Sequence, residues 1–144
     1  MTDRRTIEAL SEALDDEYKA RATYRKVIER FGPVRPFVNI VEAEDRHVAA
    51  FLAQFRRLGA TPPEDTWAPR VKAPESVEQA CTDAVQAEIE NDAMYSRLLE
   101  QVTDAQAHSV MLRLQDASRN QHLPAFRRCV ERGGGGGGLG RGRR

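Results

Sequence analysis

The sequence predicts an all-α protein, with four long helices in an up-down-down-up bundle and a long crossover between the second and third helices. Three observations predict it. Four long segments carry apolar residues at helical spacing, a proline-rich stretch separates the first two segments from the last two, and the two halves of the chain repeat each other. The 144 residues suffice for one domain. We assign residues 1–131 to the bundle and residues 132–144 to a disordered Gly/Arg-rich tail.

The composition narrows the classes of function. Lys and Arg together number 22, as do Asp and Glu, so no net charge favours nucleic acid as a partner. The N-terminal residues lead straight into an amphipathic segment, with no apolar signal core and no apolar run of membrane length. We therefore expect a cytoplasmic protein that binds neither nucleic acid nor a membrane.

The first helix is expected over residues 4–31, where Gly32-Pro33 ends the helical pattern. The residues that share its inward stripe are Leu10, Leu14, Glu17, Tyr24 and Phe31. Glu17 is the exception on this stripe, because a buried carboxylate is costly unless something compensates for it.

The second helix is expected from about residue 35 to residue 58, with Gly59 as its C-terminal cap. Its apolar face is interrupted by Glu44 and His47, which lie three residues apart and therefore project from the same side. A carboxylate and an imidazole at this spacing are the ligand pair of carboxylate-bridged metal sites in four-helix bundles. On its own, the pair is also common on solvated helix faces.

The stretch from residue 60 to residue 74 contains four prolines and should be an irregular crossover. Fully extended it could cover roughly 50 Å, whereas a helix of this bundle is roughly 35 Å long. It can therefore cross the whole bundle and let the third helix run parallel to the second. Trp67 in its middle is expected to hold it against the surface of the helices.

The third and fourth helices are expected over residues 76–102 and 104–131. Glu88 interrupts the inward stripe of the third helix, and His122 lies on the inward stripe of the fourth. Pro124 should kink the fourth helix or start a local bulge there, since it removes one hydrogen bond of the helical ladder.

The internal repeat links these polar residues. Residues 14–24 align with residues 85–95, which matches Glu17 with Glu88, and residues 47–51 align with residues 122–126, which matches His47 with His122. Counted back from the two hairpin turns, all these side chains lie roughly 20 Å from their hairpin tips. One cluster at mid-height can therefore gather Glu17, Glu44, His47, Glu88 and His122.

With this pattern the chain resembles the ferritin-like superfamily over nearly its whole length up to about residue 130. It looks closest to a ferritin-like domain family of undefined function. The stretches that carry the resemblance are DEYKA at 16–20, FGPVRPF at 31–37, VEAEDRH at 41–47 and HLPAF at 122–126. The superfamily's di-iron pattern is one Glu from each first helix and Glu-x-x-His from each second helix. The resemblance thus implies that Glu17, Glu44, His47, Glu88 and His122 are metal ligands.

The sixth position of that pattern departs from it. Arg119 stands three residues before His122, where the pattern asks for Glu. The remaining set could hold one divalent ion or an asymmetric pair. Alternatively, Arg119 neutralises Glu88 directly and leaves no metal in the second half of the site.

The resemblance implies iron as the metal, and carboxylate and imidazole ligands suit Mn or Zn as well. By analogy, one or two ions would serve iron oxidation or the handling of oxygen or peroxide. The competing hypothesis is a metal-free helical module whose buried acids are neutralised by neighbouring side chains, and whose flexible tail contacts a partner. A homodimer is compatible with either hypothesis.

Two further pairs lie on the ligand stripes. Tyr24 and Tyr95 could donate hydrogen bonds to the ligands or act as core aromatics with satisfied hydroxyls. Cys81 and Cys129 are expected to face each other within the second hairpin, as two buried free thiols if the protein is cytosolic.

Overall fold

The structure is a computed structural model that describes residues 3–134. Every regular element in this range is helical: α1 (Arg4–Phe31), α2 (Phe37–Leu58), the short 3-10 helix η1 (Ala68–Arg70), α3 (Val77–Leu99), α4 (Ala105–Ala117), the π-helical turn η2 (Ser118–His122) and α5 (Leu123–Glu131). Because α4, η2 and α5 follow one another without a break, they form a single fourth rod. The all-α expectation is confirmed.

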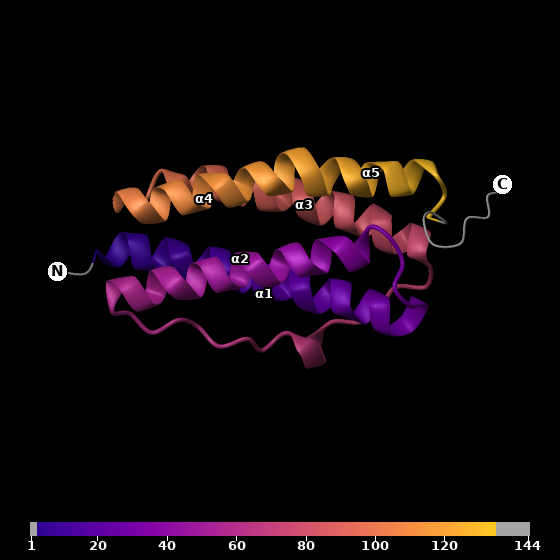
Figure 1. Ribbon diagram of the computed structural model, residues 1–144, viewed down its shortest axis with the longest axis horizontal. Helices are drawn as coiled ribbons and strands as arrows, with labels where there is room; N and C mark the ends of the chain where they lie inside the picture. The colour runs from indigo at the N-terminus through magenta and orange to yellow at the C-terminus, as the bar shows by residue number, and fades with distance from the viewer. Residues whose placement is uncertain (1–2, 135–144) are drawn as a thin grey trace.

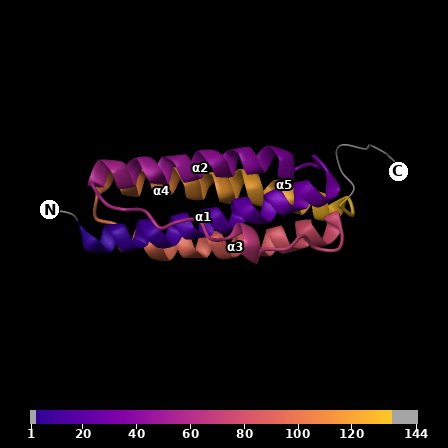
Figure 2. The same cartoon turned by 90° about the horizontal axis from the view of Figure 1, so that it is seen from below.

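The four rods form the expected up-down-down-up bundle (Figure 1). α1 and α2 make one antiparallel hairpin, and α3 makes the other with the rod of α4, η2 and α5. The crossover runs along the outside of the bundle from the end of α2 to the start of α3, so these two helices point the same way (Figure 2). The long crossover therefore spans the bundle and lets α3 run parallel to α2, as its length predicted.

Short polar side chains and glycines define the helix ends. Asp3, Ser76 and Asp104 each accept a hydrogen bond from a backbone N–H in the first turn of α1, α3 and α4. α2 ends at Gly59 in the left-handed conformation, with φ of 69°, which glycine adopts without a Cβ clash. The predicted glycine cap is thus confirmed.

The crossover is held against α1 by specific contacts. The indole Nε1 of Trp67 donates to Asp15 at 3.0 Å, and the guanidinium of Arg70 stacks over the indole ring at 3.7 Å. Tyr18 of α1 donates to the backbone oxygen of Pro63 at 3.1 Å. Trp67 therefore fixes the irregular segment to the bundle surface, as expected.

Two apolar clusters fill the bundle, one towards each end. The larger includes Leu10, Leu14, Phe51, Phe55, Tyr95, Leu98, Met111 and Leu114. The second includes Tyr24, Val27, Phe37, Ile40, Cys81, Phe126 and Cys129. The buried acids and histidines of the two hairpins lie between these clusters, so the polar layer occupies the middle of an otherwise apolar core.

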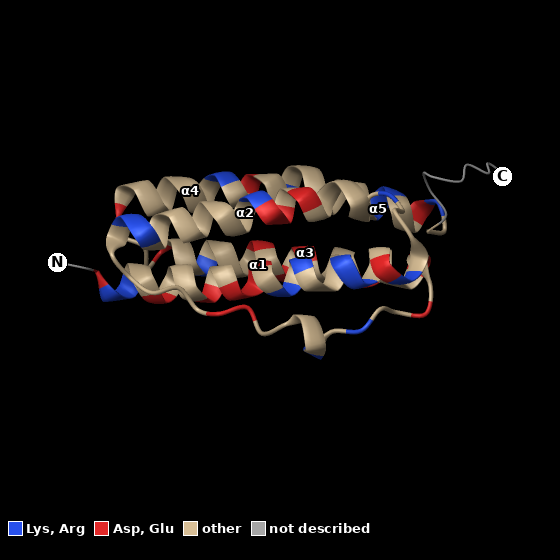
Figure 3. Cartoon of the chain, turned by 60° about the horizontal axis from the view of Figure 1, so that its bottom comes forward, with Lys and Arg blue, Asp and Glu red and all other residues tan. Residues whose placement is uncertain are grey.

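Charge on the bundle surface is mixed rather than gathered by sign. Figure 3 shows Lys and Arg interspersed with Asp and Glu along the helices on the face in view. Several are paired: Arg21 contacts Asp45 at 3.2 Å and Asp65 at 3.1 Å, and Arg25 contacts Asp45 at 3.0 Å. Exposed pairs of this kind contribute little to stability.

The two cysteines form a disulfide, which corrects the expectation of free thiols. The sulfur atoms of Cys81 and Cys129 are bonded, with their Cα atoms 6.1 Å apart, and both residues are fully buried. The expectation that they face each other was right. The thiol state was wrong because it rested on an assumed reducing compartment, whereas the Cα separation across α3 and α5 falls in the range that a disulfide spans.

The end of α5 is capped before the glycine run continues. The backbone N–H of Gly133 donates to Val130 and that of Gly134 to Cys129, at 3.0 and 2.8 Å. A Cβ on Gly134 would lie 2.4 Å from the backbone of Glu78, so only glycine fits this approach to α3. The rest of the expected disordered tail lies outside the described residues.

None of the helices in the described range combines the length and the apolar character that crossing a membrane requires.

The disulfide generates a first prediction. A Cys81→Ser/Cys129→Ser variant should lose about 2–4 kcal/mol of unfolding free energy, since the bridge closes a loop of 48 residues in the unfolded chain. Urea denaturation of the oxidised protein and the variant measures this difference. Thiol titration of the oxidised, denatured protein should find no free thiol, and two reactive thiols would contradict the bridge.

Candidate metal centre

The structure brings the five sequence-predicted side chains together at mid-height of the bundle. They form two groups, one of Glu17, Glu44 and His47 and one of Glu44, Glu88 and His122, and within each group the ligand atoms lie within 4.8 Å of one another. Each of the five residues is at most 5% exposed. Glu44 belongs to both groups, so its carboxylate joins the two halves of the site.

Each histidine contacts a different oxygen of this carboxylate. His47 Nδ1 lies 3.4 Å from Glu44 Oε1 and 3.3 Å from Glu17 Oε1. His122 Nδ1 lies 3.5 Å from Glu44 Oε2 and 3.8 Å from Glu88 Oε2. The two imidazole rings stack at 5.5 Å with 14° between their planes. Glu44 thus offers one oxygen to each half of the site.

Two tyrosines tie the halves together across the bundle. Tyr24 of α1 donates to Glu88 of α3 at 2.8 Å, and Tyr95 of α3 donates to Glu17 of α1 at 2.6 Å. Each hydroxyl therefore serves the carboxylate of the other hairpin, although each tyrosine follows the carboxylate of its own helix in sequence. Burial raises the pKa of both hydroxyls well above the ordinary value, so both remain donors. The tyrosines are core aromatics and partners of the site at once.

Burial and mutual repulsion set different pKa values for Glu17 and Glu44 in the metal-free protein. Burial and the nearby Glu17 carboxylate raise the pKa of Glu44 well above its ordinary value. Burial also opposes ionisation of Glu17, but hydrogen bonds from Glu44 and His47 and the charge of His47 lower its pKa to about 2. The neutral form is therefore favoured at Glu44 and the ionised form at Glu17.

Two buried polar atoms of the site have no hydrogen-bond partner. They are Glu44 Oε1 and His122 Nδ1, one in each half. Buried polar atoms are rarely left unsatisfied, because desolvation costs about 1–3 kcal/mol each. A divalent cation would satisfy both, and carboxylate oxygen with imidazole nitrogen is a donor set suited to Fe, Mn or Zn. The residues present therefore fit a metal ion.

Arg119 does not enter the site, which excludes the expected alternative that it neutralises Glu88. Its side chain is 53% exposed, and its Nε donates to Asp92 on α3 at 2.9 Å. The reason is the π-helical turn at Ser118–His122, which adds a residue to the turn before His122. Ser118, one residue earlier, is buried in place of Arg119. The local bulge expected at Pro124 thus lies at Ser118–His122, two residues before the proline, and it determines which side chain faces inward.

Sequence reasoning missed two polar residues beside the site. Asn91 Nδ2 donates to Asp16 Oδ2 at 2.7 Å, and burial raises the pKa of Asp16 to about 6 against the opposing effect of this hydrogen bond. Both residues line a cavity of about 420 Å³ that also reaches Glu44 and Glu88. Because Asp16 directly precedes Glu17, the sequence predicts that it lies near the site. The sequence does not predict its hydrogen bond to Asn91 of α3.

Among solved structures, one similar to this chain is described as the crystal structure of ferritin-like, diiron-carboxylate proteins from Bacillus anthracis str. Ames. The two chains share 26% identity with a TM-score of 0.69, over 88% of this chain and 96% of the other. This chain has the ferritin-like fold. No family model matches the sequence, and no curated protein matches it either. Within this ferritin-like bundle, the buried Glu and His groups are arranged so that they could hold a metal.

Protonation of Glu44 generates a pH prediction for the metal-free ferritin-like bundle. A carboxyl whose pKa is raised on folding contributes stability below its unfolded value of 4.5, and this contribution is lost as the pH rises through the raised pKa. Unfolding free energy in chelator should therefore fall as the pH rises from about 4.5 towards the raised pKa of Glu44. Glu44→Gln keeps a neutral side chain and should flatten this decline. Denaturation curves from pH 6 to 9 test it, and equal slopes for both proteins would refute the assignment.

The outward position of Arg119 generates another prediction. Arg119→Ala should cost at most about 1 kcal/mol of stability, because it removes only a part-exposed ion pair with Asp92. Its bound metal, measured by elemental analysis, should equal that of the unmodified protein. A loss of several kcal/mol in the metal-free protein would show instead that the guanidinium neutralises a buried carboxylate.

Proposed function

We propose that this protein binds one or two divalent metal ions in the core of the bundle, with iron as the first candidate and manganese or zinc as the others. Glu17, Glu44, His47, Glu88 and His122 would be the ligands. One observation carries the proposal: two buried Glu/His groups share Glu44, and each group contains a polar atom that lacks a hydrogen-bond partner.

The protein's own residues would have distinct roles at such a site. Glu44 would be a ligand in both halves of the site, since each of its oxygens faces one histidine. Tyr24 and Tyr95 would hold Glu88 and Glu17 in orientation through their hydroxyl hydrogen bonds. The two apolar clusters on either side would limit access of water from the ends of the bundle.

When bound, redox-active iron would supply electron transfer to oxygen or peroxide, the chemistry that likeness to a diiron-carboxylate protein suggests for this chain. We therefore propose an oxidoreductase role in iron oxidation or in oxygen or peroxide handling. The site offers three carboxylates where the di-iron pattern has four, so charge balance favours one ion or an asymmetric pair. A cytoplasmic location and a homodimer stay predictions.

Metal content is the direct test. Protein purified without chelator should contain Fe, Mn or Zn by elemental analysis, and a Glu44→Ala/His47→Ala variant should lose most of it, because it removes the residue common to both halves. Glu42→Ala/His108→Ala is the matched control, since it deletes a Glu and a His outside the two groups. Only trace metal in the unmodified protein after reconstitution with each ion would favour the metal-free interaction module.

Binding should also release protons. Burial and the Glu17 carboxylate raise the pKa of Glu44 and so favour its protonated form in the metal-free protein, and a metal ion displaces the ligand proton. Calorimetric titration in buffers of different ionisation enthalpy should therefore give enthalpies that differ with the buffer. Buffer-independent enthalpies would contradict this protonation state.

A further inference from the structure

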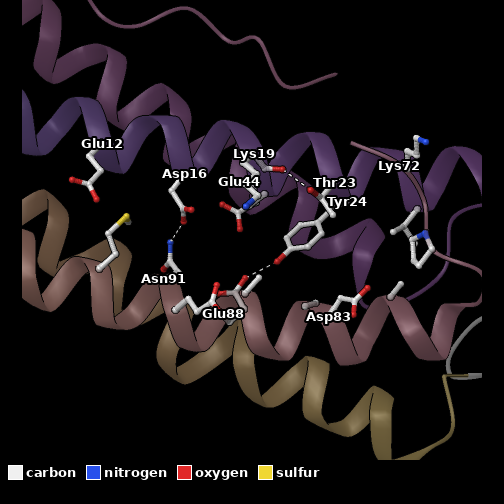
Figure 4. A pocket seen from close by; sticks show the side chains of 18 of the residues that line it. Glu12, Asp16, Lys19, Thr23, Tyr24, Glu44, Lys72, Asp83, Glu88 and Asn91 are labelled. Atoms are coloured by element: carbon white, nitrogen blue, oxygen red, sulfur yellow. Dashed lines mark hydrogen bonds between the residues drawn. The ribbon is translucent and has the colours of Figure 1, made fainter. Parts of the chain in front are cut away.

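The cavity between α1 and α3 leads from the surface of the bundle to the candidate metal centre. Its volume is about 420 Å³, whereas a water molecule occupies about 30 Å³. Its lining includes the exposed Lys19 and Asp83 as well as the buried Glu44 and Glu88, and Figure 4 shows these two glutamates between the helices. A small molecule can therefore pass from solvent to two of the candidate ligands without the unfolding of a helix.

The cavity reaches one half of the centre rather than both. Of the five candidate ligands, Glu44 and Glu88 line it, whereas Glu17, His47 and His122 do not. Glu88 belongs only to the group that also contains His122, and Glu44 is common to both groups. The group of Glu44, Glu88 and His122, which we call the second half-site, is therefore the one that faces the cavity.

The second half-site has room for a further ligand. Glu44, Glu88 and His122 supply three protein ligands, and catalytic zinc sites with three protein ligands keep their fourth position for water or substrate. Arg119, at the sequence position of the missing carboxylate, faces away from the centre toward Asp92, so its side chain does not close such a position. The other group also offers three ligands, but the residues that belong to it alone do not border the cavity.

The walls of the cavity favour an uncharged molecule. The buried Ala80 and Ala84 of α3 and Val27 of α1 give it an apolar lining. Exposed charged side chains of both signs also line it: Lys19, Lys72, Arg97, Glu12, Asp83 and Glu90. Because both signs are present and Arg97 is paired with Glu12, these side chains select neither a cation nor an anion. An ion would also lose hydration along the apolar walls.

We propose that the second half-site is where the reactant meets the metal, and that the cavity between α1 and α3 admits this reactant, a small uncharged oxidant of the size of dioxygen or hydrogen peroxide. The inference rests on the proposed function and specifies which half of the centre the oxidant reaches. Glu88 would face the incoming molecule, while the Tyr24 hydroxyl donates to its carboxylate at 2.8 Å and holds it in place.

Dissolved dioxygen is the first probe, because it is paramagnetic and speeds the relaxation of nearby protons. The measurement uses the full-length protein in chelator under oxygen pressure, and its readout is the relaxation of methyl protons. The methyl groups of Ala80 and Ala84 in the cavity wall should show severalfold larger enhancements than those of Ala13 and Ala107, which are buried outside the cavity.

Leucine in the cavity wall supplies blocked forms of the protein. Ala87 is an exposed residue of α3 that lines the cavity, so Ala87→Leu fills part of the space without disturbing the core. It should bring the enhancements at Ala80 and Ala84 close to those of the buried reference alanines. Ala20→Leu fills the same space from α1 and should act in the same way. Ala49→Leu, at an exposed position of α2 outside the cavity lining, is the matched control and should change nothing.

Nitric oxide is the second probe, since it is uncharged, has the size of dioxygen and gives a characteristic electron paramagnetic resonance signal on Fe(II). Protein loaded with Fe(II) in the absence of oxygen should form this complex about tenfold more slowly in Ala87→Leu, because a blocked path makes entry depend on side-chain movement. Ala49→Leu should react at the unmodified rate. The signal per protein should be lost in His122→Ala and retained in His47→Ala, which remove one histidine from each half.

Four outcomes would overturn the proposal: equal enhancements at the cavity and reference alanines, enhancements unchanged by both cavity-filling variants, equal nitric oxide rates in Ala87→Leu and Ala49→Leu, or any other distribution of the signal between the two histidine variants. The relaxation measurements contain chelator, so they judge the access path without a metal. Protein that takes up no metal would refute the proposed function, whereas protein that takes up iron but fails these tests would refute the present inference alone.

Discussion

Buried negative charge is the constraint on which the centre of this bundle depends. Three carboxylates and two imidazoles lie between two apolar clusters, where an isolated charge is expensive. Part of the cost is offset within the chain: two tyrosine hydroxyls donate to Glu17 and Glu88, and the raised pKa of Glu44 favours its neutral form. What remains uncompensated, an oxygen of Glu44 and a nitrogen of His122, is what a cation can satisfy.

The two halves of the site are related by an internal repeat but are not equivalent. Glu44 comes from the intact Glu-x-x-His of α2, whereas the fourth rod presents Arg119 at that spacing and then turns it outward through the π-helical segment. An inward guanidinium at this position would lie beside the buried imidazole of His122, among groups arranged as possible metal ligands. The backbone bulge avoids this and leaves Glu44 as the one carboxylate common to both halves within the described residues.

The hairpins are stabilised by different means. The second is covalently closed by Cys81–Cys129 between α3 and α5. The first is braced from outside by the crossover, through Trp67 on Asp15 and Tyr18 on Pro63. Between the hairpins, the seam of α1 and α3 is lined by small residues over part of its length and contains the cavity. The helices pack closely within each hairpin and less closely between the hairpins. The bundle can therefore contain both the buried polar layer and the cavity beside it.

Helical periodicity in the sequence determined the four rods and the inward position of Glu17, Glu44, His47, Glu88 and His122, because a 3.6-residue repeat specifies which side of each helix is apolar. The length of the crossover determined that the second and third rods run parallel. Neither determined what meets across rods. The crossed hydrogen bonds of Tyr24 and Tyr95, the bond between Cys81 and Cys129, the pairing of Asp16 with Asn91 and the cavity beside them depend on distances between helices far apart in the chain. The direction of Arg119 depends on one extra residue in a helical turn. The residue pattern alone does not specify this π-helical turn, but the packing of the fourth rod does.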